Sequence, residues 1–211
     1  MISLGTSARE SRAEVARLVA SFDLDAVARW AAGERRAVAT LQRLLFDDDE
    51  RLRGRAIEAL GVAVEVLARD DLERAREVVR RTLWLMNDES GGLLWSGPQV
   101  IGAILARVPA LCPEFGEILA SFLEEEPFRT GTRWALWRIS RASPGTVLGA
   151  ADALRASLDD PDPGVRGHAA MALRAAGAEL PDLAGDAGEF TLFDHRTGEL
   201  RRTSVAEAAA R

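Results

Sequence analysis

The chain has 211 residues, of which 47% are hydrophobic, and this is enough to bury a core as one domain or one short repeat array. Its formal net charge of -6 argues against a nucleic acid as the main ligand, because such binding draws its affinity largely from clustered cations. The single cysteine, Cys112, excludes an intramolecular disulfide and a thiolate metal cluster, which is typical of a reducing compartment.

The amino-terminal sequence passes directly into an acidic, arginine-rich helical pattern and lacks the apolar stretch of a signal peptide. No apolar run of about 18 residues occurs in the sequence, so we expect no membrane-spanning helix. We therefore predict a cytoplasmic protein with no membrane partner.

Helical periodicity dominates all but the carboxy-terminal part of the chain. Ser7 and Glu10 form a capping-box pattern before the first apolar stripe, and Gly33 is suited to end the second helix. Apolar stripes over 38–45 and 52–67 predict a further pair of helices joined by a tight turn. Each pair leaves an apolar face that another pair must cover.

Two of these helix pairs repeat one another at a constant offset of 113 residues, the difference between 166 and 53. Arg53 then corresponds to Arg166, and the intervening segment 122–140 fits with one extra loop residue, which places Arg129 opposite Arg53. So many matches at one offset predict an internal repeat. The other superposed residues are Leu41 with Leu154, Leu45 with Leu158, Asp47 with Asp160, Asp49 with Asp162, Leu52 with Val165, Gly54 with Gly167, Ala56 with Ala169 and Leu60 with Leu173.

The repeated unit, with apolar residues, an acidic turn, a Val-Arg or Leu-Arg pair and an alanine-rich helix, resembles the HEAT family. The likeness is strongest over 159–177, which is similar to the short bacterial PBS-lyase HEAT-like repeats, and it extends over about 35–178. It implies an all-α fold for residues 1–180, a right-handed α-solenoid of about five helix pairs whose second helices line a concave face. The chain also resembles an uncharacterised bacterial subgroup with an NDESGG-type loop, which implies no activity.

The carboxy-terminal segment 181–211 departs from the helical period. Apolar alternation around a polar turn at Gly198 predicts a β-hairpin after a linker, and Ser204 with Glu207 predicts the start of a short terminal helix. Since a lone hairpin is not stable in water, we expect this one to pack on the end or on the inner face of the helical array.

Acidic residues occupy the internal turn of every unit, so stacking of the units would align them along one edge. One interpretation is an acidic ridge that binds a basic partner or a cation. The other, which we favour, is that these residues cap helices and pair with arginines of the neighbouring unit. The predicted structural ladder consists of Asp47, Asp49, Arg53, Arg129, Asp160, Asp162 and Arg166.

The third unit interrupts the repeat with a longer loop within 83–98 that contains a double glycine. Two interpretations stay open, with a slight preference for the second. The polar residues lie at the rim of an aromatic-lined pocket that binds a ligand, or they cap a helix while tryptophans fill space between units. The candidate binding residues are Asn87, Asp88, Glu89, Ser90, Trp95, Trp134 and Trp137.

Trp134 and Trp137 are three residues apart and share one helical face. Together with Arg133, Arg138 and Arg141 they would form an aromatic and basic patch, unless these arginines pair with acidic residues, which we favour. Tryptophan at such positions more often belongs to the core, because its burial removes a large apolar area from water.

No residue pattern predicts a reaction, a metal site or a cofactor. The two histidines, His168 and His195, lie far apart in the sequence, and Cys112 has no neighbouring base, so we expect no catalytic residues. The prediction is a non-catalytic scaffold or adaptor that binds another protein or a peptide at the third-unit loop and the concave face. The alternative is a HEAT-like DNA glycosylase, or another enzyme acting on nucleic acid, that uses a cleft of tryptophans and a carboxylate.

Overall fold

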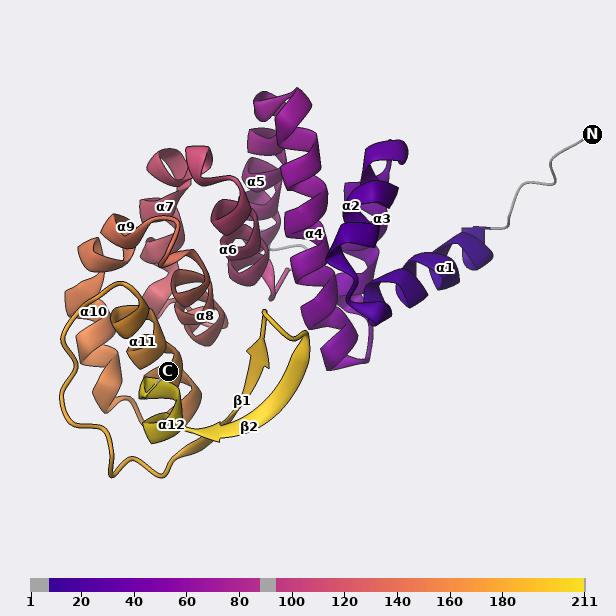
Figure 1. Ribbon diagram of the computed structural model, residues 1–211. Helices are drawn as coiled ribbons and strands as arrows, with labels where there is room; N and C mark the ends of the chain where they lie inside the picture. The colour runs from indigo at the N-terminus through magenta and orange to yellow at the C-terminus, as the bar shows by residue number, and fades with distance from the viewer. Residues whose placement is uncertain (1–7, 88–93, 211) are drawn as a thin grey trace, which may run out of the picture.

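The computed structural model describes residues 8–87 and 94–210, which form helices α1 to α12 and a two-stranded antiparallel sheet (Figure 1). The α-helices are α1 (Ala8–Ser21), α2 (Leu24–Gly33), α3 (Ala37–Gln42), α4 (Glu50–Asp70), α5 (Leu72–Met86), α6 (Gly97–Arg107), α7 (Cys112–Ser121), α8 (Arg129–Ile139), α9 (Pro144–Gly149), α10 (Ala151–Ala156), α11 (Pro163–Ala175) and α12 (Val205–Ala209). The strands are β1 (Glu189–Asp194) and β2 (Glu199–Ser204). The described part of the chain is therefore mostly helical, with a small sheet near its carboxy-terminal end.

Five helices lie side by side in the order α2, α4, α6, α8 and α11, and we call them the inner row. Helices α3, α5, α7 and α10 pack behind this row, each against its successor in the chain. The row bends into an arc, and the hairpin lies across the open side of that arc (Figure 1).

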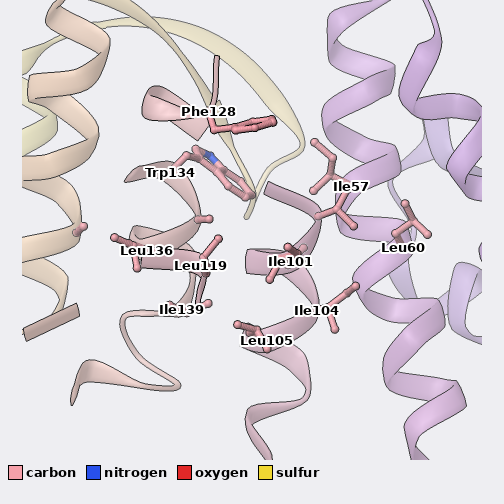
Figure 2. Close-up of a cluster of buried hydrophobic side chains, with 14 of the residues drawn as sticks. Ile57, Leu60, Ile101, Ile104, Leu105, Leu119, Phe128, Trp134, Leu136 and Ile139 are labelled. Atoms are coloured by element: carbon pink, nitrogen blue, oxygen red, sulfur yellow. The ribbon is translucent and has the colours of Figure 1, made fainter. Parts of the chain in front are cut away.

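The core lies between successive helices of the inner row. Figure 2 shows Ile101 and Ile104 of α6 between Leu60 of α4 and Leu136 of α8, and all four side chains are fully buried. Burial of such a side chain stabilises the fold by about 1.5–3 kcal/mol. The apolar stripes of the sequence are therefore the contact surfaces between neighbouring helices.

The acidic turn before α4 has a defined set of contacts. The side chain of Asp49 caps the helix by accepting from the main-chain N–H groups of Arg51 and Leu52. Asp47 accepts from the main-chain N–H of Asp49 at 3.2 Å. Arg53 donates through Nη1 to the main-chain oxygens of Asp47 and Asp48 at 2.6 and 3.0 Å.

The turn before α11 repeats these contacts. Asp162 caps α11 by accepting from the main-chain N–H of Gly164, and Asp160 accepts from the main-chain N–H of Asp162 at 2.9 Å. Arg166 donates through Nη1 to the main-chain oxygens of Asp160 and Pro161 at 2.7 and 3.2 Å. The internal repeat predicted at an offset of 113 residues is thus present in the contacts of both turns.

The middle unit differs in its arginines. Arg129, the first residue of α8, bonds to the Asp160 carboxylate of the next unit instead of the main chain of its own turn. The main-chain contact is made one helical turn later by Arg133, which is fully buried and donates to the oxygen of Leu123 at 2.5 Å and to Ser157 Oγ. The sequence alignment that placed Arg129 opposite Arg53 therefore does not correspond to equivalent contacts, because the longer turn shifts the helix start.

The hairpin predicted in the carboxy-terminal segment is confirmed, with Phe190 paired to Thr203 and Phe193 to Leu200. Its turn contacts α4, where Arg55 donates to the main-chain oxygen of Gly198 at 2.8 Å and pairs with Glu199. The predicted cap of the terminal helix is also present, since Ser204 and Glu207 form a capping box at the start of α12.

Two glycines of the inner row leave room for two phenylalanines of β1. A Cβ atom on Gly54 of α4 would lie 2.5 Å from the ring of Phe193, and one on Gly167 of α11 would lie 2.2 Å from the ring of Phe190. These distances are too short for any side chain. The two glycines occupy equivalent places in the repeat, so the hairpin packs on equivalent places of two units and covers the inner face between them.

Among the helices of the described residues, none combines the length and the apolar composition that are needed to cross a bilayer.

Candidate functional site

A cavity of about 330 Å³ lies between the hairpin and the amino-terminal parts of α4, α6, α8 and α11, and we call it the hairpin pocket. Its volume is at the lower end of the range of small-molecule sites. Three aromatic side chains contribute to its wall together with several hydrogen-bonding groups. The lining residues are Glu50, Arg53, Gly54, Ile57, Trp95, Ser96, Gln99, Thr130, Trp134, His168, Thr191, Phe193 and Leu200.

Trp134 fixes the hairpin on one side of this pocket. It is buried, and its indole Nε1 donates to the main-chain oxygen of Phe193 at 3.0 Å. The ring of Phe193 lies 6.3 Å from the ring of Trp134, measured between centroids. This tryptophan therefore anchors β1 and does not offer an open surface to a partner.

His168 supplies an unpaired acceptor in the pocket wall. Its Nδ1 lies 2.7 Å from the main-chain oxygen of Gly164, and because a carbonyl can only accept, Nδ1 carries the proton. Burial lowers the pKa of His168 to about 4, so the ring is neutral near pH 7 and its Nε2 is an acceptor. Within 8–87 and 94–210, neither Nε2 of His168 nor Oε1 of Gln99 has a hydrogen-bond partner, although both atoms are buried.

Trp95 lies at the edge of the same pocket with 69% of its surface exposed. Exposed tryptophan is costly to hydrate, and tryptophan is enriched where proteins bind one another. The pocket thus joins a buried polar wall to an exposed aromatic side chain. A group that carries an N–H or O–H donor on an apolar body would match both features.

The candidate residues of the sequence are brought together only in part. Trp95 and Trp134 line the hairpin pocket. Trp137 instead meets His195 edge to face, with 4.7 Å between the ring centroids, and lines a different cavity. Asn87 ends α5, where its main-chain N–H bonds to the oxygen of Trp84 and its Nδ2 to that of Leu83. Asp88, Glu89 and Ser90 lie outside the described residues.

The structural ladder contributes one residue, Arg53, to the pocket. The other arginines of the ladder have partners elsewhere, since Arg129 bonds to Asp160 and Arg166 forms two bonds to Asp186 of the linker, at 2.7 and 2.9 Å. The bond from Arg166 lowers the pKa of Asp186. Pairing between neighbouring units therefore occurs for Arg129, while Arg53 and Arg166 hold their own turns.

Sequence reasoning missed Gln99, His168 and Phe193 as pocket residues. Gln99 follows Pro98 at the start of α6, and His168 looks like any polar residue on an alanine-rich helix. Only the position of the hairpin encloses them. The equivalent glycines at positions 54 and 167 were a usable signal, because a repeated glycine in a helix indicates a close approach.

The described residues contain no group of three or more His, Cys, Asp or Glu side chains that could hold a metal ion. Cys112 is buried, and burial raises the pKa of its thiol, which disfavours the reactive thiolate. His168 and His195 line separate cavities.

Comparison with known protein families, with curated proteins and with solved structures finds no match to this chain.

Proposed function

We propose that this chain is a HEAT-like α-solenoid that acts as a non-catalytic binding module for a protein or peptide. The side-by-side order of the inner row and the equivalent turns before α4 and α11 support a stacked repeat. About five helix pairs would then form a right-handed superhelix, with α2, α4, α6, α8 and α11 as the second helices. The hairpin would close the middle of the concave face.

We further propose that the partner binds at the hairpin pocket, and one observation carries this proposal. Trp95, largely exposed, adjoins a cavity whose wall holds two buried acceptor atoms without partners, on His168 and Gln99. A buried polar atom without a partner costs about 1–3 kcal/mol, which a ligand with a matching donor would recover. A peptide segment that places an apolar side chain against Trp95 and a donor group near His168 fits this arrangement.

The burial of Trp134 argues against the alternative of a base-extruding enzyme. Such an enzyme needs aromatic side chains that are free to stack on an extruded base. Trp134 is buried with its N–H bonded to the hairpin, and Trp137 packs against His195. Glu58, the carboxylate behind them, is fully buried and paired with Arg138.

Site-specific photo-crosslinking in the cells that produce the protein tests the proposed function. A crosslinking amino acid is placed at position 95 in one variant and at position 46 in the other, because Phe46 is 66% exposed and lies outside the pocket. A partner captured at position 95 but not at position 46 supports the proposal. The same proteins at both positions, or none at position 95, would contradict it.

Affinity for the captured partner gives the second part of the test. Trp95→Ala should weaken binding by about 30-fold, the loss expected of an interface hot spot of about 2 kcal/mol. Phe46→Ala is the matched control and should leave binding unchanged. Both side chains are exposed, so each variant should keep its stability within about 0.5 kcal/mol.

A further inference from the structure

A second cavity, of about 350 Å³, lies at the other ends of the inner-row helices, and we call it the arginine pocket. It is enclosed by the carboxy-terminal turns of α6, α8 and α11 and by the hairpin turn. Its wall contains Trp137, His195 and four arginines, Arg138, Arg141, Arg174 and Arg196. The aromatic and basic patch expected from the sequence of α8 is therefore present in part, as one wall of this pocket.

Two of the four arginines have their charge compensated. Arg138 forms two bonds to the fully buried carboxylate of Glu58, at 2.9 and 3.0 Å, and Arg196 pairs with Asp194 at 3.1 Å. These two side chains are held in place by their partners. Because each is paired with a carboxylate, these two arginines add no net charge to the pocket.

The other two arginines carry uncompensated charge. Across 8–87 and 94–210, neither Arg141 nor Arg174 has a carboxylate within 4.0 Å, although many other arginines of the described chain do. Arg174 lies in the last turn of α11, where a cation interacts favourably with the helix dipole. Arg141 lies beyond the end of α8, so an interaction with the dipole from within the last helical turn does not explain its position. Other exposed arginines of the described chain, Arg17 among them, also have no carboxylate within this distance, but Arg141 and Arg174 bring two such cations to the wall of one cavity.

The aromatic part of the wall is partly polar and consists of two rings in an edge-to-face arrangement, with 69° between the planes of Trp137 and His195. The imidazole of His195 packs on the ring of Trp137, and its Nδ1 is buried without a hydrogen-bond partner in the described chain. The buried side chain of Met171 lies beside them. A planar apolar group could therefore lie against this wall while an attached anion meets the arginines.

We propose that the arginine pocket binds a small organic anion, a carboxylate or a phosphate ester on a planar apolar body. The oxyanion lies between Arg141 and Arg174, where guanidinium groups donate paired hydrogen bonds to such oxygens. The body lies against Trp137 and His195. This site is separate from the hairpin pocket, so it does not depend on the proposed function.

Calorimetric titration with phenyl phosphate, benzoate and inorganic phosphate tests the site. Phenyl phosphate or benzoate should bind at a single saturable site. The tighter of the two shows whether the pocket prefers a phosphate ester or a carboxylate. Inorganic phosphate should bind at least about tenfold more weakly than phenyl phosphate, since it lacks the apolar body. Absence of saturable binding by either aromatic anion up to about 10 mM would overturn the proposal.

Arginine variants connect the binding to this pocket. Arg141→Gln and Arg174→Gln should each weaken it about tenfold, the effect of one charge-assisted hydrogen bond. Arg69→Gln and Arg155→Gln remove exposed arginines elsewhere and should have no effect. Equal losses in all four variants would show general charge attraction and contradict a built site.

Protection of arginines from chemical modification can be measured on the unsubstituted protein, so this test does not depend on whether a variant folds. Phenylglyoxal modifies accessible arginines, and peptide mapping by mass spectrometry locates the modified positions. Bound phenyl phosphate or benzoate should reduce modification of Arg141 and Arg174 at least about fivefold while leaving Arg69 unchanged, because only a filled pocket shields the first two. Unchanged modification of Arg141 and Arg174 under saturating probe would overturn the proposal.

Discussion

The indole N–H of Trp134 donates to the main-chain oxygen of Phe193, and this bond joins α8 to a strand 59 residues later in the chain. The ring of Phe193 continues the contact into α4, where it occupies the space above Gly54. One strand of the hairpin is therefore held by two helices of the inner row. Loss of either contact should loosen the hairpin before it affects the helices.

Trp134→Phe should destabilise the protein by about 1–3 kcal/mol, because it leaves the Phe193 oxygen without a donor and removes buried aromatic area. Urea unfolding measures the loss. Hydrogen exchange should show faster exchange in β1 and β2 than in α4. The matched control is Trp84→Phe, because Trp84 is 64% exposed and its replacement should change stability by less than about 0.5 kcal/mol. Equal effects of the two variants would contradict an anchoring role for Trp134.

Gly54→Ala should destabilise the protein by about 1–3 kcal/mol, since the new methyl group would meet the ring of Phe193. Gly33→Ala is the control, because Gly33 lies at the end of α2 with no atom within 4 Å of an added Cβ. That change should be neutral or stabilising by up to about 1 kcal/mol through helix propensity. Thermal unfolding of both variants decides the matter, and a stabilised Gly54→Ala would show that the hairpin does not pack there.

The sequence predicted the helices, the hairpin and the acidic turns, because each depends on local patterns. Asp49 and Asp162 cap helices through their own neighbours in the chain, and Ser204 with Glu207 form the predicted box. Capping is decided within a few residues. Such contacts can be deduced from a single sequence without knowledge of the tertiary structure.

The residues of the hairpin pocket were harder to predict from the sequence, because the pocket depends on where the hairpin lies. Trp134 was expected at an open concave face or in the core, and the structure places it beneath β1, while His168 becomes a pocket residue only through the same covering. Arg133 was expected in a basic patch or in an ion pair with an acid, and it is buried beside Ser157 and pairs with Glu124 at 2.7 Å. Contacts between segments so distant in sequence follow from tertiary packing, which local periodicity does not encode.

Glu58→Leu should destabilise the protein by about 3–5 kcal/mol, because it leaves Arg138 without its buried partner. Adding Arg138→Met should recover part of that loss by removing the unpaired charge. Glu73→Leu serves as the exposed control, since its pairs with Arg76 and Arg80 lie at the surface and should be worth less than about 1 kcal/mol. Chemical unfolding of the three variants forms the test. No recovery in the double variant would contradict a paired role for Glu58.

Stability should fall as the pH falls from 6.5 toward 4, and His168 should be one cause. Its pKa is lowered to about 4 by burial, whereas an unfolded chain titrates near 6.5. Between these values the unfolded chain binds a proton that the folded protein does not, so acid favours unfolding by about 1 kcal/mol per pH unit from this residue. Above pH 6.5 both states are neutral and the contribution disappears.

His168→Asn tests this assignment, because the asparagine amide can still donate to the oxygen of Gly164 but does not titrate. Urea unfolding between pH 5.5 and 6.5 avoids most carboxylate titration. The variant should reduce the pH slope by about 1 kcal/mol per pH unit. Since burial also lowers the pKa of His195 to about 4, His195→Gln should reduce the slope further, and the double variant should be nearly flat. An unchanged slope in His168→Asn would mean that the ring takes up its proton without unfolding, and the hairpin pocket would then present a charged group instead of an acceptor.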